Sequence, residues 1–306
     1  MNNISKKNTN KFLLNHFCDT HPIDWDKAFK RKAPLIVEIG FGNGDYLVSQ
    51  AKKYPHKNFI GIEIEFHLIK KITKRIQKSK VKNIRLLCLD AYVAFDRLFK
   101  NRSIQFCYSL FPFPWPKKRH HKKRLFHKDF LRIVNSRLKS KGQFQIVTDF
   151  KPYFEWTIRQ ASNTGFTIKR KRIETQFDTR FERMWSKEGQ NLFFSLTLTK
   201  KEHSNISISK QAKIGTVVLL NFDPDKIKYK NKKEPNMNII FKKFSFDKKK
   251  NEAIQKVVIC EPHLTQLFDI IVLKDKNKWK AEIRKSHRFI STEGLRKCLE
   301  IIKERS

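Results

Sequence analysis

The segment Leu35–Gly44, which reads LIVEIGFGNG, decides the fold class of this chain. Its first five residues suit a buried strand, and glycine then occupies every second position of the turn that follows. Glycine permits a tight turn and lets the backbone approach a ligand closely. An amphipathic stretch comes next, so the segment predicts a strand, a ligand-binding turn and the start of a helix.

Short apolar runs alternate with amphipathic stretches along the following 160 or so residues. The apolar runs predict strands at 35–39, 58–64, 84–89, 104–110, 143–147, 166–172 and 192–199. The amphipathic stretches predict helices at 46–54, 67–78, 91–98, 128–138 and 153–162. Alternating strands and helices, with strands that are apolar throughout, predict a parallel α/β sheet covered on both faces.

Composition divides the chain into four parts. Residues 1–34 are polar and form a basic N-terminal arm, and residues 35–200 form the sheet domain. Residues 201–212 are rich in serine and charge and predict a linker. Residues 213–306 predict a small α+β domain of five strands and a helix at 291–304. This extension is basic and shows no catalytic group, so we interpret it as a candidate RNA-binding part.

The net charge indicates the partner more than the fold. The chain has 67 Lys and Arg against 29 Asp and Glu, a formal net charge of +38. Nucleic acid is the expected partner for such a charge. An anionic membrane is the alternative, but no apolar run approaches the roughly 20 residues that a spanning helix needs. We therefore expect no membrane association.

Cysteine usage and the N-terminus bear on localisation. The five cysteines are scattered and odd in number, which predicts reduced thiols and neither a disulfide framework nor a zinc site. The histidines lack metal-ligand spacing, so no metal is expected. The first residues lack the apolar core of a signal peptide. We expect a cytoplasmic protein.

Three carboxylates stand at or near the ends of successive predicted strands. Glu38 precedes the glycine turn, Glu63 ends the second strand and Asp90 follows the third. Each of these acids, taken alone, could equally be a helix cap or a solvated strand end as a ligand-binding group. Together, and without a P-loop lysine, they predict a pocket for a cationic or neutral nucleoside. S-adenosylmethionine, which carries a sulfonium, fits that description.

An aromatic and basic loop follows the fourth predicted strand. Phe111–Leu125 reads FPFPWPKKRHHKKRL, in which prolines exclude a helix interior and place rings beside cations. Rings stack on bases, and Lys and Arg neutralise phosphates. The alternative is a solvated charge run, but open α/β sheets bind ligands at the carboxyl ends of their strands. The loop therefore predicts a nucleic-acid contact.

Two further segments are candidates for the substrate side. Thr148 and Asp149 end the fifth predicted strand, and residues 179–182 read TRFE before the last strand. A glutamate can accept hydrogen bonds from the N1–H and amino group of guanine, so Glu182 is a candidate for base recognition. A salt-bridged loop is the alternative interpretation.

These motifs together resemble the bacterial tRNA (guanine-N7)-methyltransferase family, which methylates guanine 46 in the variable loop. The resemblance covers about residues 35–200. It rests on EIGFGNG at 38–44, GIE at 61–63, DA at 90–91, FPxPWPKKRH at 111–120, TD at 148–149 and TRFE at 179–182. The proline–tryptophan–basic block is the most specific of these motifs.

The resemblance implies a class I S-adenosylmethionine-dependent methyltransferase fold, Rossmann-like, with a seven-stranded sheet whose last strand is antiparallel. It implies tRNA as partner and S-adenosylmethionine as methyl donor. The residues expected to bind the donor are Glu38, Gly40, Gly42, Gly44, Glu63 and Asp90. Those expected to contact the tRNA are Lys117, Asp149, Thr179, Arg180, Phe181 and Glu182.

One departure from the family pattern bears on catalysis. The family usually has an aspartate inside the proline block, and this chain has Phe113 there. We expect Asp149 to supply the missing charge, in an enzyme that acts as a monomer. The alternatives are a weakly active or inactive RNA-binding protein on a methyltransferase scaffold, and a methyltransferase for another RNA base.

Overall fold

The computed structural model describes residues 11–14, 21–284 and 289–306 of the chain. These residues divide into two compact units. The first holds Pro22–Ser209 together with residues 11–14, and the second holds His21 and Lys210–Ser306. The boundary at Ser209 lies inside the segment expected as a linker, 201–212.

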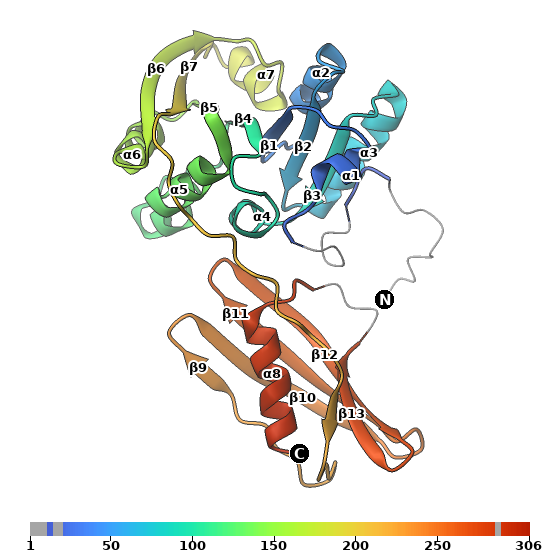
Figure 1. Ribbon diagram of the computed structural model, residues 1–306. Coiled ribbons are helices and arrows are strands. Elements are labelled where there is room, and N and C mark those ends of the chain that lie inside the picture. The colour runs from blue at the N-terminus through green and yellow to red at the C-terminus, as the bar shows by residue number, and fades with distance from the viewer. Residues whose placement is uncertain (1–10, 15–20, 285–288) are drawn as a thin grey trace. The chain divides into compact units, whose positions relative to one another are not determined.

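A seven-stranded sheet forms the centre of the first unit (Figure 1). Its strands lie in the order β3-β2-β1-β4-β5-β7-β6. Their bounds are β1 Leu35–Ile39, β2 Asn58–Glu63, β3 Ile84–Cys88, β4 Ile104–Leu110, β5 Leu138–Thr148, β6 Phe166–Glu174 and β7 Leu192–Lys200. The first five strands pair in parallel, and β7 runs antiparallel to both β5 and β6. The expected sheet with an antiparallel last strand is confirmed.

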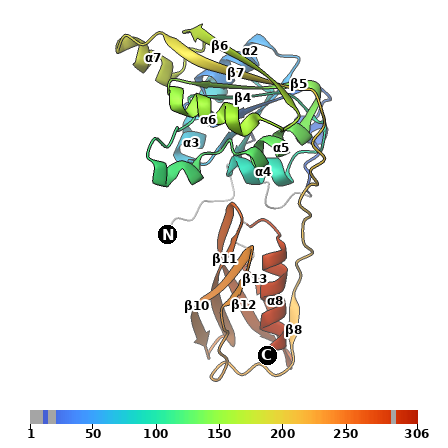
Figure 2. The same ribbon diagram turned by 90° about the vertical axis from the view of Figure 1, so that its left-hand side faces the viewer.

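Apolar strands and amphipathic helices account for this architecture. All five residues of β1 are buried, as expected for a central strand covered on both faces. The helices of the unit are α1 Trp25–Phe29, α2 Asp45–Lys53, α3 Phe66–Ser79, α4 Ala91–Arg97, α5 Lys128–Arg137, α6 Lys151–Ala161 and α7 Arg180–Lys187. Helices α4, α5 and α6 lie in a row on one side of the sheet (Figure 2).

Three elements of the first unit were not expected from the sequence. Helix α1 lies in the segment expected as an arm, where Trp25 and Phe29 are buried. A 3-10 helix, η1 Lys118–Lys123, forms inside the aromatic and basic loop. Helix α7 occupies part of the segment expected as a substrate loop.

The first half of the expected linker is fixed to the first unit by a buried arginine. The side chain of Arg137, at the end of α5, is fully buried and donates to the carbonyl oxygens of Ile206 at 2.9 Å and Ser207 at 3.2 Å. The backbone N–H of Ser209 donates to the carbonyl of Asp96 at 3.2 Å. Residues 204–209 therefore form an ordered strap and not a flexible tether.

The second unit is an antiparallel sheet with one helix on a face of it (Figure 1). Its strands lie in the order β8-β13-β12-β11-β10-β9. The bounds are β8 Val217–Leu219, β9 Lys232–Glu234, β10 Met237–Asp247, β11 Glu252–Glu261, β12 Leu264–Asp275, β13 Lys278–Ile283 and α8 Glu293–Glu304. The small α+β domain is confirmed. The strand expected at 213–222 is only β8, and β9 was not expected.

Replacing Arg137 by alanine should destabilise the first unit by about 3 kcal/mol, because several buried carbonyl oxygens lose their donor and a cavity forms. Urea unfolding followed by tryptophan fluorescence measures this effect, since Trp279 is the only one of the five tryptophans outside the first unit. Arg132→Ala, a partly exposed position of the same helix, is the control. Equal stability of the two variants would contradict the prediction.

Candidate functional site

The glycine turn after β1 adopts a backbone that favours glycine at three positions. Gly40, Gly42 and Gly44 have φ angles of 70°, 55° and 73°. A Cβ at Gly40 or Gly42 would meet nothing within 4 Å, whereas one at Gly44 would clash with the side chain of Ile72. The third glycine therefore allows α2 to pack against α3, and the first two leave open space for a ligand.

A cavity of about 200 Å³ lies beside the glycine turn. Small-molecule sites usually measure about 300–1,000 Å³, so this cavity fits part of a nucleoside-sized ligand. Its walls combine the turn with the start of α2, the end of β4 and the start of α7. Of the expected site residues, the lining includes Glu38, Gly40, Gly42, Thr179, Arg180 and Phe181. Donor-side and substrate-side residues, far apart in the sequence, thus meet at one cavity.

Glu38 is the most perturbed acid of this cavity. It lies near the carboxyl end of β1 and is only 2% exposed. Burial raises the pKa of Glu38 to about 8, the charge of Glu63 adds to the shift and the Tyr108 hydroxyl opposes it. Within the described part of the chain, Glu38 Oε2 is buried and has no hydrogen-bond partner. A buried carboxyl oxygen without a partner favours a cationic or hydrogen-bonding ligand.

Glu63 ends β2 and Asp90 follows β3, and both lie outside the lining of this cavity. Glu63 Oε2 accepts from the backbone N–H of Gly42 at 3.1 Å, which ties β2 to the glycine turn. Asp90 caps α4 by accepting at Oδ1 from the backbone N–H of Tyr92 at 2.8 Å. The cap interpretation of Asp90 is therefore correct, and this cap uses Oδ1 alone. All three acids stand at the carboxyl edge of β1, β2 and β3.

The start of the aromatic and basic loop closes the cavity. Phe111 is buried, lines the cavity and packs edge-to-face on Phe193 with 5.0 Å between ring centroids. Its backbone N–H donates to the carbonyl of Val147 at 2.8 Å. Phe111 and Trp115 have φ angles of 53° and 44°, values that are rare for bulky residues. Strained backbone of this kind clusters at functional sites.

The buried side chain of Arg124 fixes the loop through hydrogen bonds to its backbone carbonyl groups. It is 3% exposed and donates from Nε to the carbonyl of Pro114 at 2.9 Å. Its guanidinium lies 5.0 Å from the ring centroid of Trp156 and 5.3 Å from that of Tyr153. Burial lowers the pKa of Arg124. The expectation that the basic block up to Arg124 contacts phosphates is wrong for this residue, because its side chain is enclosed.

The rest of the loop presents rings and cations together, as the sequence predicts. Phe113 is 66% exposed and packs edge-to-face on Trp115 at 4.8 Å. The ammonium of Lys123 lies 4.7 Å from the centroid of Trp115. Lys117 is exposed and occupies the position just before η1. An exposed ring next to solvated cations is the arrangement that a nucleic acid requires.

Glu182 has a different set of partners from the one expected. It is 2% exposed, and its two carboxylate oxygens accept from the backbone N–H groups of Gln176 at 2.7 Å and Phe177 at 2.8 Å. Its own N–H donates to Thr179 Oγ1 at 3.1 Å. These partners are backbone groups, so the contacts of Glu182 match neither the base recognition nor the salt-bridged loop that the sequence suggested. Glu182 instead positions the segment that carries the cavity residues Thr179–Phe181.

Asp45, which the sequence analysis missed, joins the two sides of the site. It follows the glycine turn at the start of α2 and pairs with Arg75 of α3. Arg183 of α7 donates to Asp45 Oδ2 at 3.2 Å and to Asp178 Oδ1 at 2.6 Å. The ion pairs link the donor side, through α2, to the substrate side, through α7. Acidic residues in a first helical turn are common, so no sequence signal singled out Asp45.

Asp149 follows β5 and lies outside the lining of the cavity, as does Lys117. Its side chain is partly buried, and this burial raises its pKa. The loop reaches the same strand end, because Phe111 bonds to Val147 two residues before Asp149. The structure therefore places Asp149 near the base of the loop that contains Phe113.

The described residues contain no group of three or more His, Cys, Asp or Glu side chains that could hold a metal ion. In the same residues, no helix combines the length and apolar character that crossing a membrane requires. The described cysteines Cys88, Cys107, Cys260 and Cys298 are free thiols, and Cys18 lies outside the described residues.

Comparison with known proteins places the first unit in a family. The model of a family described as "Putative methyltransferase" matches residues 32–195. A tRNA (guanine-N(7)-)-methyltransferase of Chlorobium phaeobacteroides is 46% identical over 180 residues, covering 58% of this chain and 88% of that protein. A solved structure of an antibiotic-related methyltransferase, 18% identical, covers 62% of this chain and 99% of that one with a TM-score of 0.47.

A further relative reaches into the second unit. A tRNA (guanine-N(7)-)-methyltransferase of Aquifex aeolicus is 29% identical over 275 residues, covering 88% of this chain and 92% of that protein. A match of this extent exceeds the first unit, so the sequence similarity includes part of the C-terminal extension. The family match, the sheet order and the acids at the strand ends agree, and the chain belongs to the tRNA (guanine-N7)-methyltransferase family.

Proposed function

We propose that this chain transfers a methyl group from S-adenosylmethionine to N7 of guanine 46 in the variable loop of tRNA. The cavity that combines the glycine turn, Glu38 and Thr179–Phe181 is the observation that carries the proposal. Phosphates of the tRNA would lie along the exposed cations of the aromatic and basic loop. Reduced cysteines support a cytoplasmic location. Action as a monomer stays a prediction.

The donor fits the residues that line the cavity. S-adenosylmethionine supplies an electrophilic methyl group on a positively charged sulfur, and it carries an ammonium and a ribose. Glu38 offers a buried carboxyl oxygen that lacks a partner, and Gly40 and Gly42 leave room for a ligand beside the backbone. Glu63 and Asp90 would receive the ribose and adenine parts beyond the cavity.

The chain's residues position the reaction and do not need to remove a proton. Guanine N7 has a lone pair in the ring plane and no hydrogen, so its attack on the methyl carbon requires no general base. The exposed Phe113 would stack on the turned-out base, and Phe111 in the cavity wall would help to exclude water. Holding the reactants in line contributes roughly 7–11 kcal/mol to such reactions. Asp149 would stabilise the positive charge that develops on the base.

The direct test is to incubate the purified chain with a guanine-46 tRNA transcript and methyl-labelled S-adenosylmethionine, followed by nucleoside analysis. We expect 7-methylguanosine at position 46. A transcript with adenine at position 46 is the matched control and should remain unlabelled. Label in another nucleoside would indicate a different methyltransferase, and absence of label with retained tRNA binding would indicate an inactive RNA-binding protein.

The second candidate function, an inactive RNA-binding protein, is favoured by one observation. Phe113 occupies the place of the usual acid and is exposed, so no carboxylate stands at that point of the loop. The buried Oε2 of Glu38 opposes this candidate, because a buried carboxyl oxygen without a hydrogen-bond partner costs stability that a chain without a donor would have no reason to retain.

Binding of the donor should release a proton near pH 7. The pKa of Glu38 is about 8 in the ligand-free protein, so the carboxyl holds its proton at pH 7, and a cationic ligand favours the ionised form. Affinity should therefore rise with pH up to about 8 and then level off. Calorimetry in buffers of different ionisation enthalpy measures the released proton.

Glu38→Gln cannot ionise, so it is the control for this prediction. It should bind the donor more weakly and without a pH dependence in this range. Donor binding by the wild-type chain with no proton release at pH 7 would contradict the assignment of Glu38.

Replacing Asp149 by alanine should lower kcat by about 100- to 1,000-fold, the usual effect of losing one group that stabilises developing charge. Phe113→Asp should not raise the rate, because the charge already comes from Asp149. Single-turnover methylation with saturating donor measures both rates. Donor affinity measured by calorimetry should be unaltered in Asp149→Ala, which separates catalysis from binding. A silent Asp149→Ala would refute this role.

A further inference from the structure

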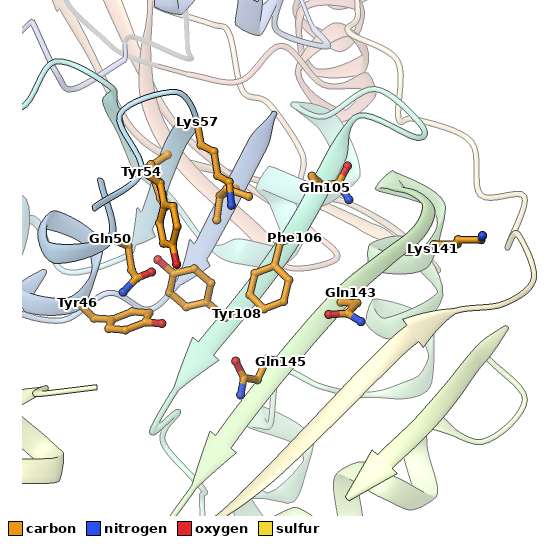
Figure 3. Close-up of a pocket in the computed structure, with 12 residues that line it drawn as sticks. Tyr46, Gln50, Tyr54, Lys57, Gln105, Phe106, Tyr108, Lys141, Gln143 and Gln145 are labelled. Atoms are coloured by element: carbon orange, nitrogen blue, oxygen red, sulfur yellow. The ribbon is translucent and has the colours of Figure 1, made fainter. Parts of the chain in front are cut away.

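A second cavity lies on the sheet and is larger than the one beside the glycine turn, which we call the cofactor cavity. Its volume is about 500 Å³, within the range of small-molecule and nucleotide sites. Figure 3 shows its labelled side chains, which come from α2, from the turn between α2 and β2 and from strands β4 and β5. We call it the sheet groove and define it by Tyr54, Lys57, Phe106, Lys141, Gln143 and Gln145. Tyr46 also lines it and lines the cofactor cavity too.

The sheet groove continues across a polar face of the sheet. Gln145 Nε2 donates to Ser195 Oγ at 3.1 Å, and Gln143 Nε2 donates to Thr199 Oγ1 at 3.4 Å. These contacts place β5 and β7 side chains on one face. Helices normally cover such a face of an α/β sheet with apolar contacts. Amides and hydroxyls in their place indicate a surface that meets water or a polar partner.

The same polar face carries lysines on the neighbouring strand β6, and its described strand positions carry no carboxylate. The register places Lys171 beside Ser195 and Lys169 beside Thr197, so both lysines share the face of the glutamines. Both are exposed, as is Lys141 at the end of the groove. Same-face positions of the described strands in Gln143–Val147, 193–199 and 167–173 include no Asp or Glu. The face is therefore complementary to an anion.

Aromatic rings line the opposite side of the groove. The ammonium of Lys57 lies 4.3 Å from the ring centroid of Tyr54, and both side chains are partly exposed. Phe106 is also partly exposed and lies 5.9 Å from Tyr108 between ring centroids. Rings next to cations form the usual platform for single-stranded nucleic acid, on which bases stack while cations contact phosphates.

We propose that the sheet groove binds a single-stranded segment of the RNA substrate. Bases would stack on Tyr54 and Phe106, glutamine amides would contact base edges, and Lys57 and Lys141 would contact phosphates. Tyr46 lines both the groove and the cofactor cavity, so the two are neighbours within the first unit. The inference rests on the proposed function in that it takes the methylated tRNA as the ligand.

An RNA is favoured over a second copy of this chain as the occupant. The chain carries a net charge of +38, so a second copy would bring like charge to a face that already has lysines. RNA brings one negative charge per nucleotide and flat bases. Charge complementarity and the exposed rings thus select the same partner.

Two variants test the groove separately through stacking and through charge. Tyr54→Ala should raise the KM for tRNA and its dissociation constant about tenfold with unchanged kcat, whereas Tyr54→Phe, which keeps the ring, should match the wild type. Lys141→Gln should reduce the slope of log affinity against log salt by about 0.7 to 1, the share of one phosphate contact. Filter binding and initial-rate kinetics measure these values.

The control variant is Lys100→Gln, an exposed lysine after α4 and outside the groove, and it should retain KM. Calorimetric affinity for S-adenosylmethionine should be unchanged in every variant, which shows that the fold and the cofactor cavity are intact. Ultraviolet crosslinking to tRNA should label peptides that contain Tyr54 or Phe106. Unchanged KM and dissociation constant in Tyr54→Ala, or crosslinks confined to the aromatic and basic loop, would overturn the proposal.

These outcomes are distinct from failure of the proposed function. If the wild-type chain binds tRNA but does not methylate it, the filter-binding and crosslinking measurements still decide whether the groove is used. If the wild-type chain methylates tRNA and the groove variants behave like Lys100→Gln, the proposed function stands and the groove inference fails. If a groove variant sediments with a lower mass than the wild-type chain and its tRNA affinity is unchanged, the groove binds a second copy of the chain instead.

Discussion

The removal of one carboxyl group from water is the constraint on which the site depends. Glu38 lies near the end of the central strand β1, and the sheet, the glycine turn and Tyr108 enclose it. Burying an acid without a partner costs free energy that the rest of the sheet must offset. The buried acid is therefore the feature that makes the cavity favour a cationic ligand.

Ion pairs and backbone contacts connect the donor side with the substrate side. Asp45 binds arginines from α3 and α7, and Glu182 organises the residues just before α7. Neither carboxylate is free to contact a base. Their contribution is to hold Thr179–Phe181 against the glycine turn, which makes the shape of the cavity depend on residues that need not touch either ligand.

The sequence predicted what periodicity and glycine chemistry control. Strands β1 and β4 have the expected bounds, and Glu38, Glu63 and Asp90 lie at one sheet edge, because parallel strands place their carboxyl ends together. It failed where side chains bond to distant backbone. The backbone contacts of Glu182 were not expected, and the burial of Arg124 could not be recognised within a run of cations. The roles of the site residues remain predictions.

The strap at 204–209 has a consequence for where the catalytic part of the chain ends. The family match stops at residue 195 and β7 ends at Lys200, yet two of the carbonyl groups that accept from Arg137 lie beyond both. A fragment cut after β7 would remove the two strap carbonyl groups from this buried guanidinium and leave it only its partners in Phe95–Ser136. We therefore expect the stable first unit to run to Ser209, so an evolutionary loss of the extension would have to spare residues 201–209, which include the strap.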